Sequence, residues 1–356
     1  MATIAQAVRM ALHYGEENLE VKDIFGEDVG PPLGGVFTAT QGLKTTWNAP
    51  LDERGIIGAA MGLAAAGDRC VAEIQFCDYI YNTIDLLKIA GNTCWASHGD
   101  WNLPFTVMTP VGSGIRGSIY HSHSFDATMT HIPGWKTVMP SNAKDAYGLL
   151  ISCLKDDNPT MFLIPKALLR VRGKEAIPGE PALDKDGQKL LSQMIDAPLG
   201  DRSKWKAKWP EGLTDYSVEI GKGKIVHPGD HITIVSYGRT LPLCEKAAQA
   251  AKEKGISVEV IDLRTLWPYD WDLVSASIRK TGRVIYVNED TEVTNFGEHL
   301  VRRTIEDLFY ELEARPKLLA GAFTPGVGLA DPLEMASTPQ YSDIVEAIEQ
   351  VVSEKA

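Results

Sequence analysis

Strand-length apolar runs alternate with helical periodicity over the first half of the chain. Apolar runs long enough for buried strands lie at residues 70–76, 105–111, 136–139 and 160–164. Between them, apolar or small residues recur every three or four positions at residues 55–66, 79–96 and 141–154. Ser141 is the predicted N-cap of the last of these helices. Strands that alternate with helices predict a parallel sheet covered on both faces.

The opening residues predict one more helix. Thr3 and Gln6 have the spacing of a capping box. The apolar residues that follow recur at every fourth position: Ile4, Val8 and Leu12. Gly15 predicts the end of this helix. The stretch contains Arg9 and no acid, as a transit peptide would, but the cap and the period favour a structural helix with no targeting segment.

Residues 173–215 interrupt the alternation, and a second alternation follows. The interruption contains four prolines, many charges and no sustained period, which predicts a linker or a surface excursion. We interpret its Trp205 and Trp209 as anchors to a neighbour. Further strands are predicted at residues 232–236, 257–261 and 284–288, and further helices at 241–254, 271–279, 296–312 and after Pro339. We therefore predict two α/β domains, residues 1–172 and 216–356, joined by the linker 173–215.

Composition and charge narrow the class of protein. Hydrophobic residues make up 44% of the chain and charged residues 23%, which is ordinary for a globular protein. The net charge of -12 argues against a nucleic-acid partner, and no apolar run is long enough to span a membrane. The five cysteines form no C-x-x-C pair. They are typical of free thiols in a reducing, cytoplasmic compartment.

The first candidate for chemistry is Glu53. Residues 50–58 (Pro-Leu-Asp-Glu-Arg-Gly-Ile-Ile-Gly) place it at a turn before a helix lined with glycine and alanine. Taken alone, it is explained as an acid at the positive end of a helix. The next strand, however, ends in the polar and aromatic residues Gln75 and Tyr79. Together these two segments indicate a binding site rather than a helix cap.

Several segments, in this order along the chain, resemble the β subunit of the decarboxylating component of 2-oxo acid dehydrogenases. They are residues 26–30 (Gly-Glu-Asp-Val-Gly), 34–37, 50–58, 72–81, 120–122, 144–159 and 260–265. The resemblance covers residues 1–172 and about 216–356, and the segment 72–81 is most similar to the branched-chain type. It implies an α/β fold: a transketolase-like pyrimidine-binding domain with a parallel sheet, followed by a transketolase C-terminal-like domain.

The resemblance also implies thiamine diphosphate and the residues that contact it. Glu53 matches the glutamate that binds ring nitrogen N1′ and drives the cofactor towards its reactive form. Such a carboxyl group needs an apolar setting that raises its pKa, which Leu51, Ile56 and Ile57 would supply. The backbone of Leu51 would lie near the aminopyrimidine. Gln75 and Tyr79 would line the same side of the pocket; otherwise they are a polar strand end and an interface tyrosine.

His121 and His123 are the second candidate. Separated by one residue, they would share a strand face and could bind a metal, but no third ligand has a suggestive spacing. By the resemblance, His121 lines the mouth of the active site and donates a proton when the acyl group passes to lipoamide. His123 stands where the family usually has glutamine.

Residues 112–117 (Gly-Ser-Gly-Ile-Arg-Gly) match the G-x-G-x-x-G pattern of dinucleotide-binding proteins. No amphipathic helix opens at the third glycine, and no acid follows about twenty residues later to bind a ribose. We interpret the segment as a flexible loop beside the active site.

A structural potassium ion is a further implication of the resemblance. Its ligands would come from a strand and from the end of a helix: Phe105, Thr106, Cys153, Asp156 and Asn158. Oxygen ligands suit such an ion. A helix end followed by a turn explains the same residues without an ion.

One half of a thiamine diphosphate site is absent from the sequence. The cofactor's pyrophosphate needs a divalent ion, usually held by a Gly-Asp-Gly motif, and the chain has none. The resemblance implies that an α subunit holds the Mg²⁺ and shares the cofactor in an α2β2 heterotetramer, and that a lipoyl acyltransferase accepts the product.

The sequence thus predicts the β subunit of a branched-chain 2-oxo acid dehydrogenase, active only with its α subunit. The alternatives are a β subunit for pyruvate or acetoin, a non-catalytic scaffold of the complex, and an NAD-binding dehydrogenase. The last would bind nicotinamide by this chain alone.

Overall fold

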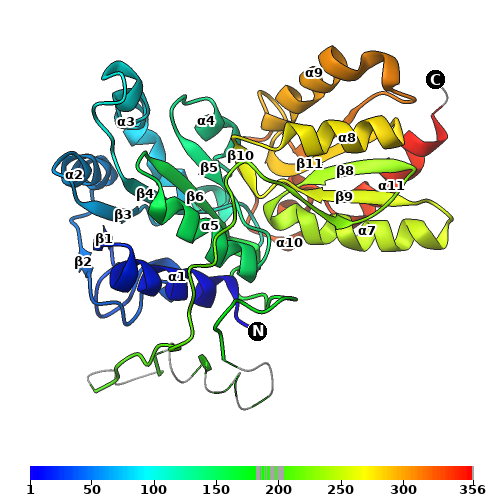
Figure 1. Ribbon diagram of the computed structural model, residues 1–356. Helices are drawn as coiled ribbons and strands as arrows, with labels where there is room; N and C mark the ends of the chain where they lie inside the picture. The colour runs from blue at the N-terminus through cyan, green and yellow to red at the C-terminus, as the bar shows by residue number, and fades with distance from the viewer. Residues whose placement is uncertain are drawn as a thin grey trace. The chain divides into compact units, whose positions relative to one another are not determined.

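The computed structural model (Figure 1) describes residues 1–181, 185, 187, 189, 191, 192, 197, 198 and 204–354, with only the backbone of Val36. The chain divides into two units. The N-terminal unit contains residues 1–110, 132–164 and 168–220, and the C-terminal unit contains 111–131, 165–167 and 221–356. Residues 111–131, predicted within the first domain, therefore group with the second unit. No helix among the described residues is both long and apolar enough to cross a membrane.

A parallel sheet forms the centre of the N-terminal unit. Its strands are β1 (Val21–Gly26), β2 (Thr46–Asn48), β3 (Arg69–Glu73), β4 (Phe105–Val111), β5 (Lys136–Val138) and β6 (Thr160–Pro165). They lie in the order β5-β6-β4-β3-β1-β2, and β1 pairs in parallel with β2 and β3, as β3 does with β4 and β5 with β6. Every residue of β4 and β6 is buried, as expected for a sheet covered on both faces.

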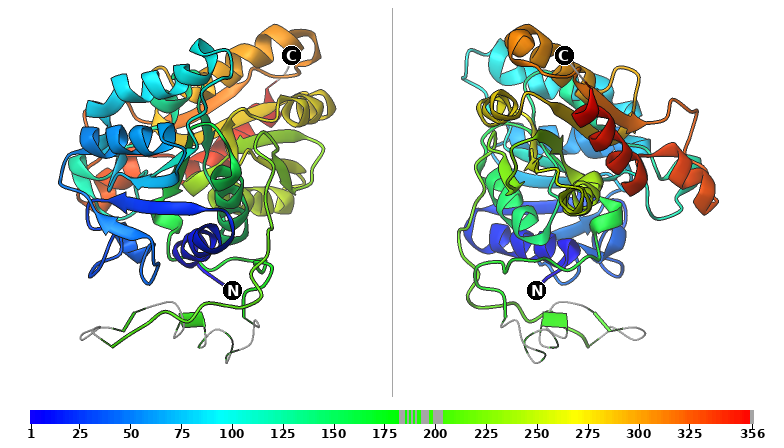
Figure 2. Two further views of the ribbon diagram at one scale, coloured as in Figure 1. Left: turned by 60° about the vertical axis from the view of Figure 1, so that its left-hand side comes forward. Right: turned by 90° about the vertical axis from the view of Figure 1, so that its right-hand side faces the viewer.

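The principal helices of this unit are α1 (Ile4–Asn18), α2 (Glu53–Ala65), α3 (Ile84–Ala96) and α5 (Ala143–Lys155). The inward faces of α1 and α5 share one apolar core with the sheet. The helices α2 and α3 run beside each other (Figure 2). Short 3-10 segments lie at Val36–Thr38 (η1), Cys77–Thr83 (η2) and Lys166–Leu168 (η4), the last of which enters the C-terminal unit in part.

Three local predictions are wrong in their details. The capping box at Thr3 is confirmed, but α1 continues past Gly15 to Asn18. Gly15 instead allows close packing, because a Cβ there would lie 2.7 Å from Leu154 Cδ1. The helix predicted at 79–96 begins only at Ile84, because η2 occupies the residues before it. The N-cap of α5 is Asn142, whose side chain accepts a hydrogen bond from the Asp145 N–H, and not Ser141.

The C-terminal unit has its own sheet. Its strands are β7 (Lys224–His227), β8 (Ile232–Ser236), β9 (Val258–Asp262), β11 (Val284–Thr291) and β12 (Lys317–Gly321), in the order β12-β11-β8-β9-β7. The edge strand β7 is antiparallel to β9, and the other pairs are parallel. The unit also contains the short strand β10 (Thr265–Trp267).

The helices of the C-terminal unit are α4 (Asp126–Thr130), α7 (Leu241–Glu253), α8 (Trp271–Thr281), α9 (Phe296–Leu308), α10 (Asp331–Ser337) and α11 (Tyr341–Ser353). Short 3-10 segments are η3 (Ser118–Tyr120), η5 (Gly238–Thr240) and η6 (Phe309–Glu311). The predicted helix 296–312 is therefore α9 followed by η6. The inner faces of α7 and α11 meet the sheet in one core.

The predicted linker 173–215 contains all the internal residues that lie outside the described ones. Its described end packs on the N-terminal unit. Trp209 stacks on His13 of α1 with ring centroids 4.1 Å apart, and Tyr147 Oη donates a hydrogen bond to the Thr214 carbonyl at 2.8 Å. We interpreted Trp209 as an anchor to a neighbour; its ring partner is α1 of the same chain.

Candidate active site

Glu53 is the first residue of α2 and is half-buried. Its Oε2 accepts a hydrogen bond of 3.3 Å from Asn82 Nδ2. The expected apolar setting is present on one side only. Ile56 and Ile57 are buried in the core, whereas Leu51 is 72% exposed. In the single chain the carboxyl group therefore lies between a buried helix face and an open surface.

Two further side chains share the electrostatic environment of Glu53. Burial raises the pKa of Glu27, and the charges of Asp28 and Glu53 raise it further. Burial likewise raises the pKa of Tyr79, followed by the charges of Asp78, Glu27 and Glu53. The charge of Glu53 thus acts on the predicted Tyr79, which lies in its neighbourhood. The same neighbourhood also includes Glu27, to which the sequence assigned no role although it lies in the segment 26–30.

Gln75 lies in the same group. Its Nε2 donates to the Glu27 carbonyl at 3.4 Å and to Asp28 Oδ2 at 3.3 Å. Gly26 and Glu73, the last residues of β1 and β3, are register partners in adjacent parallel strands, so Glu27 and Gln75 follow neighbouring strand ends. Ligands of open α/β sheets bind at this carboxyl edge. The arrangement can hold a planar ring with both polar and aromatic contacts.

Aromatic rings extend this group. Phe76 meets Tyr79 edge-to-face, with ring centroids 5.9 Å apart, and Phe37 meets Phe76 in the same manner at 6.1 Å. Neither phenylalanine was singled out from the sequence, and neither was Asn82. Phe76 follows the predicted Gln75 in sequence, and Asn82 contacts the predicted Glu53. The sequence contains no signal that would have assigned these residues a role of their own.

The surface of α2 carries mostly small side chains. Apart from Arg54, which pairs with Asp85, the exposed residues of α2 are Gly55, Gly58, Ala59, Gly62 and Ala65. Around α3, Trp95 is 87% exposed and Trp101 is 70% exposed. Large exposed apolar side chains beside a helix with small side chains are typical of an interaction surface.

Of the five predicted potassium ligands, Cys153, Asp156 and Asn158 lie at the end of α5 and Phe105 and Thr106 on β4, and most of their oxygens have partners. Asp156 accepts a hydrogen bond from the Asn158 N–H at 3.0 Å through Oδ1, and Oδ2 pairs with Lys136. Arg69 Nη1 binds the Asp156 carbonyl at 2.5 Å. Thr106 Oγ1 bonds to Thr160 Oγ1 at 2.9 Å. The carbonyl of Cys153 accepts from the Asp156 N–H at 3.1 Å, and Phe105 is packed edge-to-face on Trp135.

One atom of this group has no partner. Asn158 Oδ1 is buried and makes no hydrogen bond. A buried oxygen without a hydrogen bond is a potential ligand for a cation. The two neighbouring cations, Arg69 and Lys136, oppose a third positive charge. The residues therefore fit a monovalent ion in part.

His121 lies in the C-terminal unit, after η3, and not on a strand as the metal alternative required. The segment around it, residues 112–123, is named the histidine loop here. The loop closes where the Gly112 N–H donates to the His123 carbonyl at 2.8 Å. Neither histidine belongs to a group of three potential ligands among the described residues.

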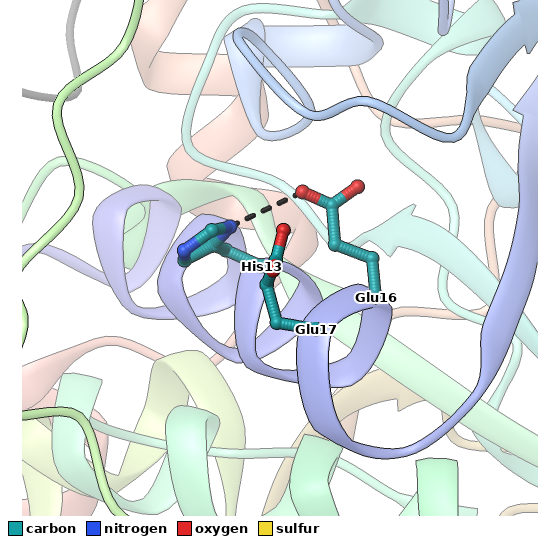
Figure 3. Close-up of side chains that lie close together, drawn as sticks. All are labelled: His13, Glu16 and Glu17. Carbon is teal, nitrogen blue, oxygen red and sulfur yellow. Dashed lines mark hydrogen bonds and ion pairs between the residues drawn. The ribbon is translucent and has the colours of Figure 1, made fainter.

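A group of that kind does occur on α1: His13, Glu16 and Glu17 (Figure 3). Its side chains already bond elsewhere. His13 Nδ1 meets Glu16 Oε1 at 3.1 Å, and Glu16 Oε2 accepts from the Lys44 N–H at 2.8 Å. Glu17 pairs with the Lys44 ammonium. The group therefore ties α1 to the loop before β2, and nothing in it points to a metal.

Two family models match the chain. The family "Transketolase, pyrimidine binding domain" matches residues 2–172, and "Transketolase, C-terminal domain" matches residues 221–344. Among solved structures, a split gene transketolase described as an inactive beta4 tetramer has a TM-score of 0.70 at 18% identity, covering 100% of both chains. At this identity the likeness shows the fold alone.

Curated relatives are closer in sequence. The 2-oxoisovalerate dehydrogenase subunit beta of Pseudomonas aeruginosa is 39% identical, covering 91% of this chain and 88% of its own. The mitochondrial 2-oxoisovalerate dehydrogenase subunit beta 2 of Arabidopsis thaliana is 34% identical over 98% of this chain and 88% of its own. The pyruvate dehydrogenase E1 component subunit beta of Bacillus subtilis is 32% identical over 98% of both chains.

Proposed function

This chain belongs to the family of 2-oxo acid dehydrogenase β subunits, and on that premise we propose that it serves the oxidative decarboxylation of a branched-chain 2-oxo acid. The substrate we favour is 3-methyl-2-oxobutanoate. The predicted family and the transketolase-like two-domain fold are confirmed by the matched family models and relatives. The family is thiamine-diphosphate dependent.

The observation that carries the proposal is the group formed by Glu53, Gln75 and Tyr79 at the carboxyl edge of the N-terminal sheet. Bound thiamine diphosphate supplies an electron sink that accepts the electron pair left when carbon dioxide departs. Glu53 would bind ring nitrogen N1′ and so would favour the reactive tautomer of the cofactor. Gln75 and Tyr79 would line the pyrimidine side, and the backbone of Leu51 would lie near its edge.

An α subunit completes the site in this proposal. The exposed Leu51, the small-residue face of α2 and the exposed Trp95 give it a surface to cover. No Gly-Asp-Gly motif exists in the chain, so the α subunit holds the pyrophosphate and Mg²⁺. The assembly is an α2β2 heterotetramer, and the chain is active only within it.

His121 assists the second half of the reaction. Acyl transfer would form a bond between the acyl carbon and one lipoyl sulfur of an acyltransferase component, break the lipoyl S–S bond and release the acyl carbon from the cofactor. The electron pair left by decarboxylation reduces this disulfide, and the other sulfur takes up a proton. We assign the donation of that proton to the imidazole of His121, because a positioned imidazole side chain can act as a general acid.

We also propose a potassium ion at the end of α5, held by oxygens of Phe105, Thr106, Cys153, Asp156 and Asn158. The support is the unpartnered Asn158 Oδ1. Its role would be to stabilise the turn after α5, with no part in the chemistry.

We propose a reducing, cytoplasmic location, since all five cysteines are free thiols. Burial raises the pKa values of Cys70, Cys153 and Cys244 to about 12, which makes these three poor nucleophiles.

The test is a decarboxylation assay of the chain assembled with its α subunit, with thiamine diphosphate, Mg²⁺ and an artificial electron acceptor. We expect 3-methyl-2-oxobutanoate and 4-methyl-2-oxopentanoate to be preferred over pyruvate and acetoin. Glu53→Gln should abolish turnover with every substrate, while the isosteric Asp52→Asn, a neighbouring acid whose side chain makes no cap bond, should retain it. Preference for pyruvate would discard the branched-chain substrate. Turnover that survives Glu53→Gln would support a non-catalytic scaffold instead.

A further inference from the structure

The histidine loop is bound at its start by a carboxylate of the C-terminal unit. Glu289, on β11, accepts hydrogen bonds from the Ser113 N–H at 3.1 Å and from the Ser113 hydroxyl at 2.9 Å, both through Oε2. Gly112 makes this approach possible: its φ is +82°, and a Cβ there would lie 2.0 Å from Glu289 Oε1. No other residue fits at this position.

A second carboxylate binds the next turn of the loop. Glu334, on α10, accepts hydrogen bonds from the Gly114 N–H at 2.7 Å and the Arg116 N–H at 3.3 Å, both through Oε1. The side chain of Arg116 also pairs with Asp331 at 2.5 and 2.8 Å. That pair is exposed on both sides and so contributes little to stability, whereas Glu334 is buried.

These contacts explain the G-x-G-x-x-G pattern. In dinucleotide-binding proteins the amides of such a loop bind a phosphate. Here the amides of residues 113, 114 and 116 bind the carboxylates of Glu289 and Glu334. Both carboxylates are buried, and hydrogen bonds to a buried charge are among the strong ones. The amides of the loop are therefore paired with carboxylates of the same chain.

The backbone between these contacts and His121 is short and crowded. A Cβ on Gly117 would lie 2.6 Å from the His121 carbonyl oxygen, and the His121 N–H donates to the Ser118 carbonyl at 3.4 Å. Ile119 is packed against Gly326: a Cβ on Gly326 would lie 2.5 Å from Cγ2 of Ile119. A shift of residues 113–116 would therefore be passed to His121.

We propose that Glu289 and Glu334 are positioning residues for His121, which set where its imidazole stands during acyl transfer to the lipoyl group. The inference rests on the role proposed above for His121 and adds the two groups through which the C-terminal unit controls it. Neither glutamate needs to contact the substrate.

The experiment compares two half-reactions of the assembled complex. We expect Glu334→Ala to lower kcat for reductive acylation of a lipoyl domain by about tenfold to a hundredfold, as a misplaced catalytic group does, with KM for the 2-oxo acid little changed. Decarboxylation with an artificial electron acceptor needs no transfer and should stay within about twofold. Glu334→Gln and Glu289→Gln keep an acceptor oxygen and should retain most transfer, and the exposed Asp331→Ala should match the unsubstituted complex.

A double-mutant cycle with His121→Ala decides whether Glu334 acts through the histidine. If it does, Glu334→Ala costs little more once His121 is gone; an additive loss would overturn the inference. An equal fall in both half-reactions, matched by a lower unfolding temperature, would show a merely structural role and overturn it as well. If His121→Ala itself leaves transfer intact, the proposed role of His121 fails. If His121→Ala abolishes transfer while Glu334→Ala does not, only the positioning inference fails.

Discussion

Asp126 is buried beside Asp290 in the C-terminal unit, and Asp290 Oδ2 accepts a hydrogen bond of 3.0 Å from the N–H of Ala127, the next residue after Asp126. Burial raises the pKa of the Asp126 carboxyl well above its usual value, and the charges of Asp290 and Glu289 raise it further. Burial also raises the pKa of Asp290. Asp126 follows the histidine loop in sequence. Because both pKa values are raised, the folded unit retains protons at a pH at which the unfolded chain has released them.

This pair predicts a pH dependence of stability. A carboxyl with a raised pKa in the folded state binds its proton more tightly there than in the unfolded chain. Its contribution is present below the unfolded pKa of about 4 and is lost as pH rises through the folded pKa, with a slope of at most about 1.4 kcal/mol per pH unit for one proton. Asp126→Asn mimics the protonated form, so we expect a flatter profile and greater stability at high pH.

Urea unfolding of both proteins from about pH 5 to about pH 8 measures this difference. Parallel profiles for Asp126→Asn and the unsubstituted chain would assign the bound proton to another group. The acids and phenol that face Asp126 are Asp290, Glu289 and Tyr237, and the pKa of Tyr237 is itself raised, first by burial.

The potassium proposal predicts an ion-specific change in thermal stability. Replacing potassium with choline should lower the unfolding temperature of the assembled protein by about 2–5 °C, because an ion that binds only the folded state stabilises it. Asn158→Ala removes the buried oxygen of this turn that has no hydrogen-bond partner, so the unfolding temperature of this variant should not depend on potassium. Equal sensitivity of both proteins to the exchange would place the ion elsewhere. If neither protein responds to the exchange of potassium for choline, no potassium ion binds this turn, and its cations are Lys136 and Arg69.

The docking of the linker's described end predicts a local loss of stability. Trp209 is half-buried on α1 and stacks on His13. Trp209→Ala should lower the free energy of unfolding by about 1–3 kcal/mol through lost apolar burial and lost ring contact. Chemical denaturation measures the change, with Trp209→Phe as the conservative control, which should recover part of it. A change below the error of the measurement would mean that the ring contact contributes nothing.

The sequence predicted the regular core well, because buried strands and amphipathic helices leave a local pattern. The bounds of β4 and β8 match the predicted runs 105–111 and 232–236. The start of α3 was misplaced because Ile80, Ile84 and Leu87 keep a helical spacing through the 3-10 turn η2. Spacing alone does not distinguish a tighter turn from an α-helix.

Contacts between distant segments could not be predicted. The partners of the histidine loop, Glu289 and Glu334, lie 176 and 220 residues beyond Ser113 and Gly114, and a single sequence carries no signal that joins them. For the same reason Glu27 was recognised as part of a motif but received no role. Only the parallel pairing of β1 and β3 brings it beside Gln75.

The exposed end of α3 predicts that α–β assembly and the folding of this chain depend on different tryptophans. Trp95 is 87% exposed, so Trp95→Ser should leave the unfolding of the isolated chain unchanged within about 0.5 kcal/mol. If an α subunit covers this end of the helix, the same change should weaken α–β association about tenfold or more, since large aromatic side chains dominate interface energies. Trp209→Ala should show the opposite pattern: lower stability with normal association.

Titration of labelled chain with α subunit measures the association, and chemical denaturation of the isolated chain measures the stability. Normal association of Trp95→Ser would exclude Trp95 from the interface and would leave the small-residue face of α2 as the surface to test next.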